Sequence, residues 1–554
     1  MRGIAFKPSL PAAWQAVAQA AERLQNTHIA DLFAQNPQRF AQWQFQLGPL
    51  LLDISKQRLD EEALASLLAL AKQQQLDEWI SRLFSHAKVN HSEGRPAWHW
   101  ALRASDSQAL KEPQAGVFNA VAEELAKMER IVEKIHAGHW RGISGEPITD
   151  VVNIGVGGSD LGPFMLSQAL ADAHASTAHP LRVHFVSSMD GSQLSPRLRE
   201  LRPDTTLFIV SSKSFTTVDT LYNAATARAW LERHLGNTDA MLRCHFIGVS
   251  AAADKMAAWG IQPENQLNFW SWVGGRFSLW SAIGLPIAIR IGMGPFRELL
   301  AGAHAMDVHF KNTPWEKNIP VLMGLVGVWN TNALGISAHA ILPYDGRLKF
   351  LPSYLEQLEM ESNGKSVDRE GNPVAVHTCP VLWGDVGSNA QHAFYQLLHQ
   401  GTVPVTCDFI VSAKRYHEPH HGESEEELRR QHELSLANCL AQSRLLAFGE
   451  KAFAQEENAP SYKRYPGNQP STTLLCEEIS PYAMGALLAA YEHKVFVQSV
   501  LWNINPFDQW GVEMGKVIAT ETLGYINQSE PIAEHLDSST QGLIAHIHAH
   551  QETE

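Results

Sequence analysis

The chain has 554 residues, of which 45% are apolar and 18% are charged, and its net charge is −14. This length favours two or more domains, and the composition is ordinary for a globular protein in water. The acidic balance argues against a broad surface for nucleic acid or anionic lipid, and the apolar runs are too short for a membrane span.

The chain has an odd number of cysteines and no CxxC pair; they are Cys244, Cys379, Cys407, Cys439 and Cys476. This pattern does not resemble a disulfide framework and fits a reducing compartment. The first residues also lack the apolar core and cleavage site of a secretory signal. We therefore expect a cytoplasmic protein whose cysteines are small buried side chains.

The N-terminal region has the apolar spacing of helices. Leucine and isoleucine recur at roughly helical intervals from Leu51, Leu52 and Ile54 onward to about residue 70, which predicts helices. The stretch 91–99 then has the composition of a loop. We interpret its two notable side chains, Arg95 and His99, as structural.

Short β-branched runs alternate with helical stretches after a predicted helix at 117–136. Strands are expected at 151–154, 183–186, 207–210 and 245–249. Buried strands that alternate with helices indicate a parallel sheet covered on both faces. Ligands of such sheets bind beyond the carboxyl ends of the strands, so the loops after these strands are the candidate site.

A second α/β unit follows, with strand candidates at 336–342, 380–383 and 405–411. Ser424 and Glu427 form a capping box that opens a long helix toward Gly449. The predicted domains are a helical region at 1–117 that packs on the second α/β domain, α/β domains at 118–290 and 291–505, and a helical tail at 506–554.

A glycine-rich turn follows the first predicted strand, where residues 155–162 read GVGGSDLG. Such a turn presents backbone N–H groups to an anion or a polar sugar. It is similar to a dinucleotide-binding fingerprint, but Asp160 stands where the third glycine belongs. A nicotinamide-dependent dehydrogenase is therefore the weaker alternative.

A cluster of hydroxyl groups follows the third predicted strand, where residues 211–217 read SSKSFTT. Hydroxyl groups, a helix N-terminus and the charge of Lys213 together make a natural phosphate cradle. The alternative is an ordinary cluster of N-cap residues, since the stretch is not a Walker A loop.

Glu361 lies in the stretch 357–365, which reads QLEMESNGK. The preceding apolar residues indicate a helix that ends near Glu361, and Gly364 is free to adopt a positive φ there. A carboxylate aimed from a helix end into a cleft can act as a base. Arg276 follows two glycines, which let backbone approach closely and aim a permanent cation. The alternatives are a solvated carboxylate and a surface ion pair.

Two further side chains and one histidine-rich loop complete the candidates. His392 is expected near a helix start, where an imidazole stays available as an acid or base. Lys516 is expected one to two turns into a helix. Either residue could instead be structural or solvated. The loop 417–421 holds three histidines, but Pro419 interrupts it, so we do not expect metal binding there.

Five of these stretches together closely resemble the glucose-6-phosphate isomerase family. The likeness lies in residues 273–284, 360–365, 391–396 and 507–516 and in the glycine-rich turn. The motifs stand in family order and span residues 90–520. The resemblance implies an α/β fold of two sugar-isomerase (SIS) domains, each an αβα sandwich around a parallel sheet, with helical regions at both ends.

The same resemblance implies the reversible conversion of glucose 6-phosphate and fructose 6-phosphate through a cis-enediolate, in glycolysis and gluconeogenesis. It implies no metal and no organic cofactor. It also implies a homodimer in which the residue matching His392 comes from the partner. The expected binding partners are therefore a sugar phosphate and a second copy of the chain, with no nucleic acid and no membrane.

The resemblance implies a role for each matching residue. Glu361 looks like the base that moves a proton between C1 and C2, and Arg276 like the cation that stabilises the enediolate. His392 and Lys516 resemble the pair that opens the sugar ring. The phosphate loop matches Ser212, Lys213, Ser214 and Thr217, and further substrate contacts match Gly158, Ser159, Gln357 and Gln509.

Two departures from the family pattern are visible. Ser214 stands where threonine is common, which keeps the hydroxyl group, while Pro96 and Trp98 stand where smaller or aliphatic residues are expected. The runner-up function is a sugar-phosphate sensor without catalysis, which would not need a base at Glu361. A related alternative is isomerisation of another sugar phosphate, such as mannose 6-phosphate, which differs in stereochemistry at C2.

Overall fold

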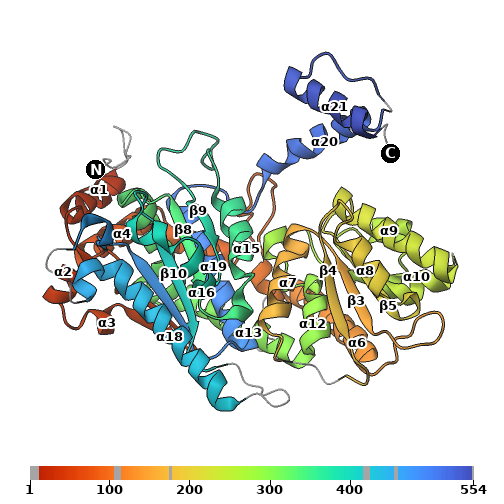
Figure 1. The fold of residues 1–554 in the computed structure, drawn as a ribbon, viewed down its shortest axis with the longest axis horizontal. Helices are drawn as coiled ribbons and strands as arrows, with labels where there is room; N and C mark the ends of the chain where they lie inside the picture. The colour runs from red at the N-terminus through yellow and green to blue at the C-terminus, as the bar shows by residue number, and fades with distance from the viewer. Residues whose placement is uncertain are drawn as a thin grey trace. The chain divides into compact units, whose positions relative to one another are not determined.

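The structure is a computed structural model that describes residues 12–104, 114–173, 177–236, 238–415, 424–453, 459–528 and 530–551. The chain divides into two compact units, Met1–Pro506 and Phe507–Glu554. The larger unit contains two β-sheets surrounded by helices (Figure 1). The histidine-rich loop at 417–421 lies outside the described residues.

The first sheet has five parallel strands in the order β4-β3-β5-β6-β7. Its strands are β3 (Asp150–Ile154), β4 (Arg182–Val186), β5 (Thr206–Ser211), β6 (Phe246–Ser250) and β7 (Gln266–Asn268). The helices of this region are α6 (Gln114–His136), α7 (Leu161–Ala169), α8 (Leu194–Glu200), α9 (Val218–Leu235), α10 (Asp239–His245), α11 (Ala253–Trp259) and α12 (Leu285–Ile291). Every residue of β3, β5 and β6 is buried, as expected of a parallel sheet covered on both faces. The four predicted strands and the predicted helix at 117–136 are confirmed.

The order of these strands reverses at β3, which pairs with β4 on one side and with β5 on the other. Parallel α/β sheets bind ligands at such a reversal, beyond the carboxyl ends of the two strands. The loops that follow β3 and β5 are the glycine-rich turn and the hydroxyl-rich loop. The topology therefore brings both predicted binding loops to the same edge of one sheet.

The second sheet has six strands in the order β1-β2-β11-β10-β8-β9. Its strands are β1 (Gln44–Leu47), β2 (Leu50–Asp53), β8 (Ala338–Pro343), β9 (Val381–Gly384), β10 (Thr406–Ser412) and β11 (Ser471–Cys476). The three predicted strands are confirmed as β8, β9 and β10. The parallel strands β9-β8-β10-β11 follow the same order along the chain as β4-β3-β5-β6, so the two α/β sheets share a topology.

The N-terminal region is helical except for the hairpin of β1 and β2. Its helices are α1 (Ala12–Leu24), α2 (Ile29–Gln35), α3 (Arg39–Gln42), α4 (Glu61–Gln73) and α5 (Leu76–Leu83). The helical interpretation of Leu51 and Leu52 is wrong, because β2 pairs antiparallel with β11. Leu52 lies opposite Leu474 in that pairing, a partner that local apolar spacing does not reveal.

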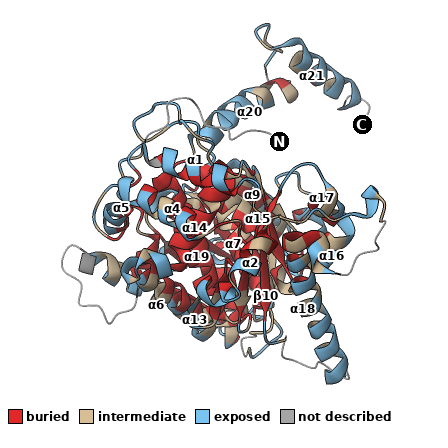
Figure 2. Cartoon of the chain, turned by 90° about the vertical axis from the view of Figure 1, so that its left-hand side faces the viewer, coloured by how far each residue is buried: buried red, intermediate tan, exposed pale blue. Residues whose placement is uncertain are grey.

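One helix, α19 (Pro481–Leu501), forms the centre of the second half. It packs against α13 (Met293–Asn312) and α14 (Ile319–Val328), and every one of its residues except Tyr482 is buried (Figure 2). The other helices here are α15 (Leu351–Glu356), α16 (Gly387–Ala393), α17 (Tyr395–Gln400) and α18 (Glu425–Phe448). Because α19 is buried on all sides, its charged side chains must find partners inside the protein.

The predicted boundaries of α18 are confirmed. The side chain of Ser424 accepts a hydrogen bond from the backbone N–H of Glu427, and Gly449 ends the helix with a φ of 53°. The second unit contains the predicted tail helices, α20 (Glu513–Ile526) and α21 (Ser538–Gln551). Among the described residues, no helix combines the length and the apolar character needed to cross a membrane.

Candidate active site

The glycine-rich turn after β3 lies directly against the loop that carries Arg276. Gly158 belongs to the short helix η2 (Gly157–Ser159) and Gly275 to η5 (Gly275–Phe277). A Cβ atom at Gly158 would stand 2.0 Å from the carbonyl oxygen of Gly275, so only glycine permits this approach. The side-chain amide of Asn153 in β3 also holds the turn, because it donates to the carbonyl oxygen of Ser159 at 3.1 Å.

Arg276 is a buried side chain whose three nitrogen atoms all contact the segments around it. Its Nε donates to Oγ of Ser362 at 2.6 Å, and its Nη2 donates to the carbonyl oxygen of Pro506 at 2.5 Å. Its Nη1 lies 3.5 Å from Oε1 of Glu361. These contacts hold a permanent cation in one orientation beside the predicted base.

Glu361 ends a short π-helix, η10 (Gln357–Glu361), which continues directly from α15. Its predicted position near a helix end is confirmed. Nε2 of Gln357 donates to Oε2 of Glu361 at 2.9 Å. One carboxylate oxygen therefore faces an arginine and the other an amide, while 22% of the side chain is exposed. Single π turns inside helices occur frequently at functional sites.

Gly364 does not use its freedom to adopt a positive φ. Its φ lies outside the left-handed region, and a Cβ atom there would stand 2.4 Å from the carbonyl oxygen of Met360. Glycine is therefore needed for a close approach at the helix end, not for backbone handedness. Nζ of Lys365 donates to the carbonyl oxygens of Glu361 and Ser362 at 2.9 and 2.8 Å, which satisfies groups that a helix end leaves unpaired.

The hydroxyl-rich loop connects β5 to α9, as predicted. Thr217 is the N-cap of α9, and its Oγ1 lies 3.1 Å from Oγ of Ser212. Oγ of Ser214 lies 2.7 Å from Oγ1 of Thr216. Phe215 has a φ of 49°, which non-glycine residues rarely adopt, and its side chain is buried. The loop thus joins hydroxyl groups to the N-terminus of an 18-residue helix, which is the chemistry of a phosphate site.

Lys213 adds a positive charge to this loop. Burial is the main cause that lowers its pKa to about 8; the carboxylate of Glu93 opposes that shift, and the guanidinium groups of Arg95 and Arg276 add to it. These interactions between charges place Lys213 in one electrostatic environment with the arginine loop. The pKa of Lys213 therefore lies within the pH range in which ordinary enzymes work, so this side chain can change its charge there.

Three residues near the site had no role in the sequence analysis. Ser362 and Lys365 hold Arg276 and the helix end, and Glu93 acts on the charge of Lys213. In the sequence, only their positions pointed to the site: Ser362 and Lys365 follow Glu361 closely, and Glu93 stands two residues before Arg95. Their partners lie on other segments, so their roles emerge only from the tertiary structure.

His392 lies in the last turn of α16 and not near a helix start, so that prediction is wrong. It is the sixth residue of a seven-residue helix, which ends at Ala393, and Phe394 separates this helix from α17. The helix N-terminus invoked for this imidazole is therefore absent. The side chain is exposed, and it makes no hydrogen bond or ion pair with any residue that the structure describes.

Gln509 and Lys516 belong to the second unit. Lys516 is the fourth residue of α20, as predicted, and its Nζ lies 3.0 Å from Oε1 of Glu513 on the same helix. Gln509 precedes a short 3-10 helix, Trp510–Val512. The roles of Gln509 and Lys516 in the reaction stay predictions.

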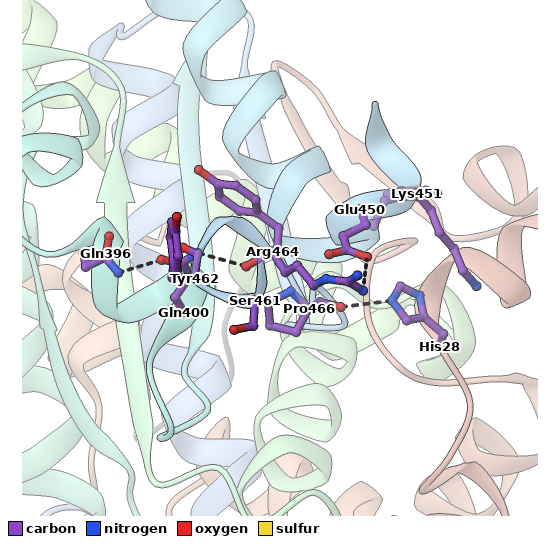
Figure 3. A pocket seen from close by; sticks show the side chains of 11 residues that line it. His28, Gln396, Gln400, Glu450, Lys451, Ser461, Tyr462, Arg464 and Pro466 are labelled. Atoms are coloured by element: carbon purple, nitrogen blue, oxygen red, sulfur yellow. Dashed lines mark hydrogen bonds and ion pairs between the residues drawn. The ribbon is translucent and has the colours of Figure 1, made fainter. Parts of the chain in front are cut away.

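A groove of ≈ 760 Å³ lies elsewhere on the first unit (Figure 3). Its charged groups have partners: Nη1 of Arg464 lies 4.0 Å from Oε2 of Glu450, and Nζ of Lys451 lies 2.6 Å from Oδ1 of Asp31. None of the predicted site residues lines it; its lining residues are His28, Gln396, Gln400, Phe448, Glu450, Lys451, Ser461, Tyr462, Arg464, Tyr465 and Pro466. The candidate site therefore remains at the strand reversal of the first sheet.

The chain is similar to known proteins over nearly its whole length. A model of the phosphoglucose isomerase family matches residues 53–544. The chain is 58% identical over 532 residues to a glucose-6-phosphate isomerase of Acinetobacter baumannii (strain AB0057), and the match covers 95% of each chain. It is 55% identical over 539 residues to glucose-6-phosphate isomerase 2 of Chromohalobacter salexigens, with 96% of each chain covered. A crystal structure of a glucose-6-phosphate isomerase from Chlamydia trachomatis matches with a TM-score of 0.83 and 31% identity, covering 97% of this chain and 99% of that chain.

Proposed function

This chain belongs to the phosphoglucose isomerase family, and from that premise we propose that Glu361 and Arg276 carry the chemistry of its reaction. The chain is an aldose–ketose isomerase that interconverts glucose 6-phosphate and fructose 6-phosphate in glycolysis and gluconeogenesis. The observation that supports the two assignments is a partly exposed carboxylate held 3.5 Å from a buried guanidinium group.

Glu361 is the base of the proposed mechanism. Its carboxylate takes the proton from C2 of the open-chain aldose and returns it to C1, while the O2 hydroxyl proton passes to O1. Removal of the C2 proton leaves negative charge on the carbonyl oxygen, and the guanidinium of Arg276 lies ready to stabilise it. Gln357 holds the second carboxylate oxygen. Because arginine supplies the positive charge, this chemistry does not require a metal ion.

The loop between β5 and α9 is the proposed phosphate site. Ser212, Ser214 and Thr217 supply hydroxyl donors, the N-terminus of α9 supplies N–H groups, and Lys213 adds a charge below pH 8. The sugar lies between this loop and the turn after β3, since both loops meet at the strand reversal. Its further contacts are assigned to Gly158, Ser159, Gln357 and Gln509.

Ring opening is assigned to His392 and Lys516. A cyclic hexose opens when its O1 hydroxyl loses a proton and its ring oxygen gains one, which calls for a base and an acid. We propose a homodimer in which His392 of each chain completes the site of the partner. The exposure of His392, without a partner among the described residues, supports this arrangement.

The domain limits and the cellular compartment are also proposed. The first parallel sheet lies within 118–290 and the parallel strands of the second within 291–505, which supports SIS domains with those limits, a helical region at 1–117 and a tail at 506–554. All five cysteines are free thiols, which supports the reducing cytoplasm.

Isomerase activity of the purified chain tests the role of Glu361. Fructose 6-phosphate is the substrate, glucose 6-phosphate formation is coupled to a dehydrogenase, and Glu361→Gln is assayed beside the native chain with and without EDTA. We expect the variant to lose roughly 10²–10⁴-fold in kcat, with binding of sorbitol 6-phosphate intact and no effect of EDTA. Native kcat in Glu361→Gln would reject the assignment. A native chain that binds but never turns over would favour the sensor.

Mixing two inactive variants tests the shared site. Glu361→Gln and His392→Gln homodimers are unfolded, mixed in equal amounts and refolded. If His392 acts across the dimer, each heterodimer contains one intact site, and activity returns to about a quarter of the native value for random pairing in a twofold dimer. If His392 acts within its own chain, every site keeps one lesion and activity stays absent.

A further inference from the structure

We propose that Lys494 is a positioning residue for the reaction: through Glu359 it holds the π-helix η10 in the form that aims Glu361 at Arg276. This inference rests on the role proposed above for Glu361. It gives a function to the ion pair of Lys494 and Glu359, for which no hydrogen bond or ion pair with the phosphate loop or the arginine loop is found among the described residues.

Glu359 and Lys494 form an ion pair in the interior. Nζ of Lys494 donates to Oε2 of Glu359 at 2.7 Å, and 2% of each side chain is exposed. Removing two charges from water is costly, and apolar residues of similar volume often stabilise a fold equally well. A pair buried this deeply is therefore better explained by a need for one defined local geometry than by stability.

The geometry in question is that of η10. Glu359 lies in the middle of this π-helix, two residues before Glu361. Its side chain points into the protein and is 2% exposed, whereas that of Glu361 is 22% exposed. A π turn holds one more residue than an α turn. If η10 relaxed to an α-helix, the residues after it would rotate about the helix axis by about 100° relative to the residues before it. Glu361 would then leave Arg276.

A second contact attaches the same segment to α19. Nδ2 of Asn363 donates to the carbonyl oxygen of Val495, the neighbour of Lys494, at 3.1 Å. The segment 359–363 is thus attached at both ends to consecutive residues of a helix that is buried almost throughout. Glu361 lies between the two attachments, so α19 acts as a rigid platform behind the base.

A small cavity of ≈ 20 Å³ lies beside Lys494. Apolar side chains such as Met323 and Val326 line it together with the polar side chains of Asn330, His339 and Asp408, and this volume suffices for one water molecule. Asp408 accepts a hydrogen bond from the hydroxyl of Tyr491 at 2.9 Å, one turn earlier on α19. The cavity therefore offers polar partners to the ammonium protons that do not bind Glu359.

Lys494→Met tests the proposal. We measure kcat and KM for fructose 6-phosphate, and we count binding sites with sorbitol 6-phosphate, which has no carbonyl group and cannot isomerise. We expect kcat per binding site to fall about 10–100-fold, the loss typical of an approximately 1 Å misplacement, while KM changes less than about threefold because the phosphate loop is untouched. A merely structural role would lower the number of binding sites and leave kcat per site unchanged.

Two further variants keep the test decisive. Ser499→Ala is the matched control: it removes a buried hydrogen bond of the same helix, from Oγ of Ser499 to the carbonyl oxygen of Phe496 at 2.7 Å, five positions after Lys494. It should keep native kcat per site whatever its effect on thermal stability. The double variant Glu359→Met, Lys494→Met replaces the pair by apolar side chains, and it should regain stability but not kcat. Native kcat per site in either Lys494 variant overturns the inference. If Glu361→Gln also keeps native activity, the proposed base itself is wrong.

Discussion

The substitution Gly158→Ala probes the contact between the glycine-rich turn and the arginine loop. A new Cβ atom would stand 2.0 Å from the carbonyl oxygen of Gly275 and 2.9 Å from the backbone nitrogen of Arg276. Ordinary contact begins near 3.4 Å, so the two loops must separate by about 1.4 Å. Overpacking of this kind costs about 1–3 kcal/mol of stability, and displacing Arg276 by 1 Å or more costs roughly 100-fold in rate.

The coupled isomerase assay and a thermal melt measure both effects. We expect kcat of Gly158→Ala to fall roughly 100-fold, because Arg276 moves away from the oxygen that gains charge. Gly275→Ala is the matched control for folding, since its Cβ atom would meet nothing within 4 Å across the same contact. It should melt as the native chain does. A Gly158→Ala enzyme with native kcat and melting temperature would show that the close approach does not position Arg276.

Two other predictions concern titrating groups, and one concerns a helix cap. KM for fructose 6-phosphate should rise above pH 8 as Lys213, with its pKa lowered to about 8, loses its charge. In Lys213→Arg the KM should not change with pH, because a guanidinium group remains protonated. An equal rise of KM in this variant would mean that another group causes the effect. Burial raises the pKa of Asp160 to about 6, so the stability it contributes is present below its unfolded pKa of about 3.9 and is lost as pH rises through 6. Urea titrations should therefore find Asp160→Asn more stable than the native chain by about 1–3 kcal/mol at neutral pH, and an unchanged pH dependence would contradict this. Ser424→Ala should destabilise α18 by about 1 kcal/mol, measured as a lower melting temperature; an unchanged one would mean that this end of the helix does not limit stability.

The features that could be predicted from the sequence depend on residues close together in the chain. Ser424 caps α18 because its acceptor and the N–H of Glu427 are three residues apart. The hydroxyl-rich loop was recognisable because Ser212, Ser214 and Thr217 lie within one strand-to-helix connection. Strand burial was visible for the same reason, since a strand covered on both faces is apolar along its whole length.

The features that escaped prediction depend on distant partners or on element ends. Glu359 and Lys494 are 135 positions apart, and nothing near Glu359 marks it as buried. The π turn at 357–361 is likewise held by contacts with α19. His392 was placed at the wrong end of its helix because neither limit of α16 is marked in the sequence: Val386 before it makes no side-chain cap, and Phe394 after it is not a glycine. Gly364 was explained by handedness, although its reason is a close carbonyl group.

The hairpin of β1 and β2 has a consequence for synthesis on the ribosome. Leu52 lies opposite Leu474, so β2 cannot join its sheet until the chain has grown by roughly 420 residues. At about 5–20 residues per second this takes some 20–80 s. Leu50, Leu51 and Leu52 can pair with β1 during that time but lack their partners in β11, whereas the first parallel sheet has all its strands once residue 268 is made. A nascent chain stalled before residue 471 should therefore bind a chaperone through this hairpin and release it once β11 emerges.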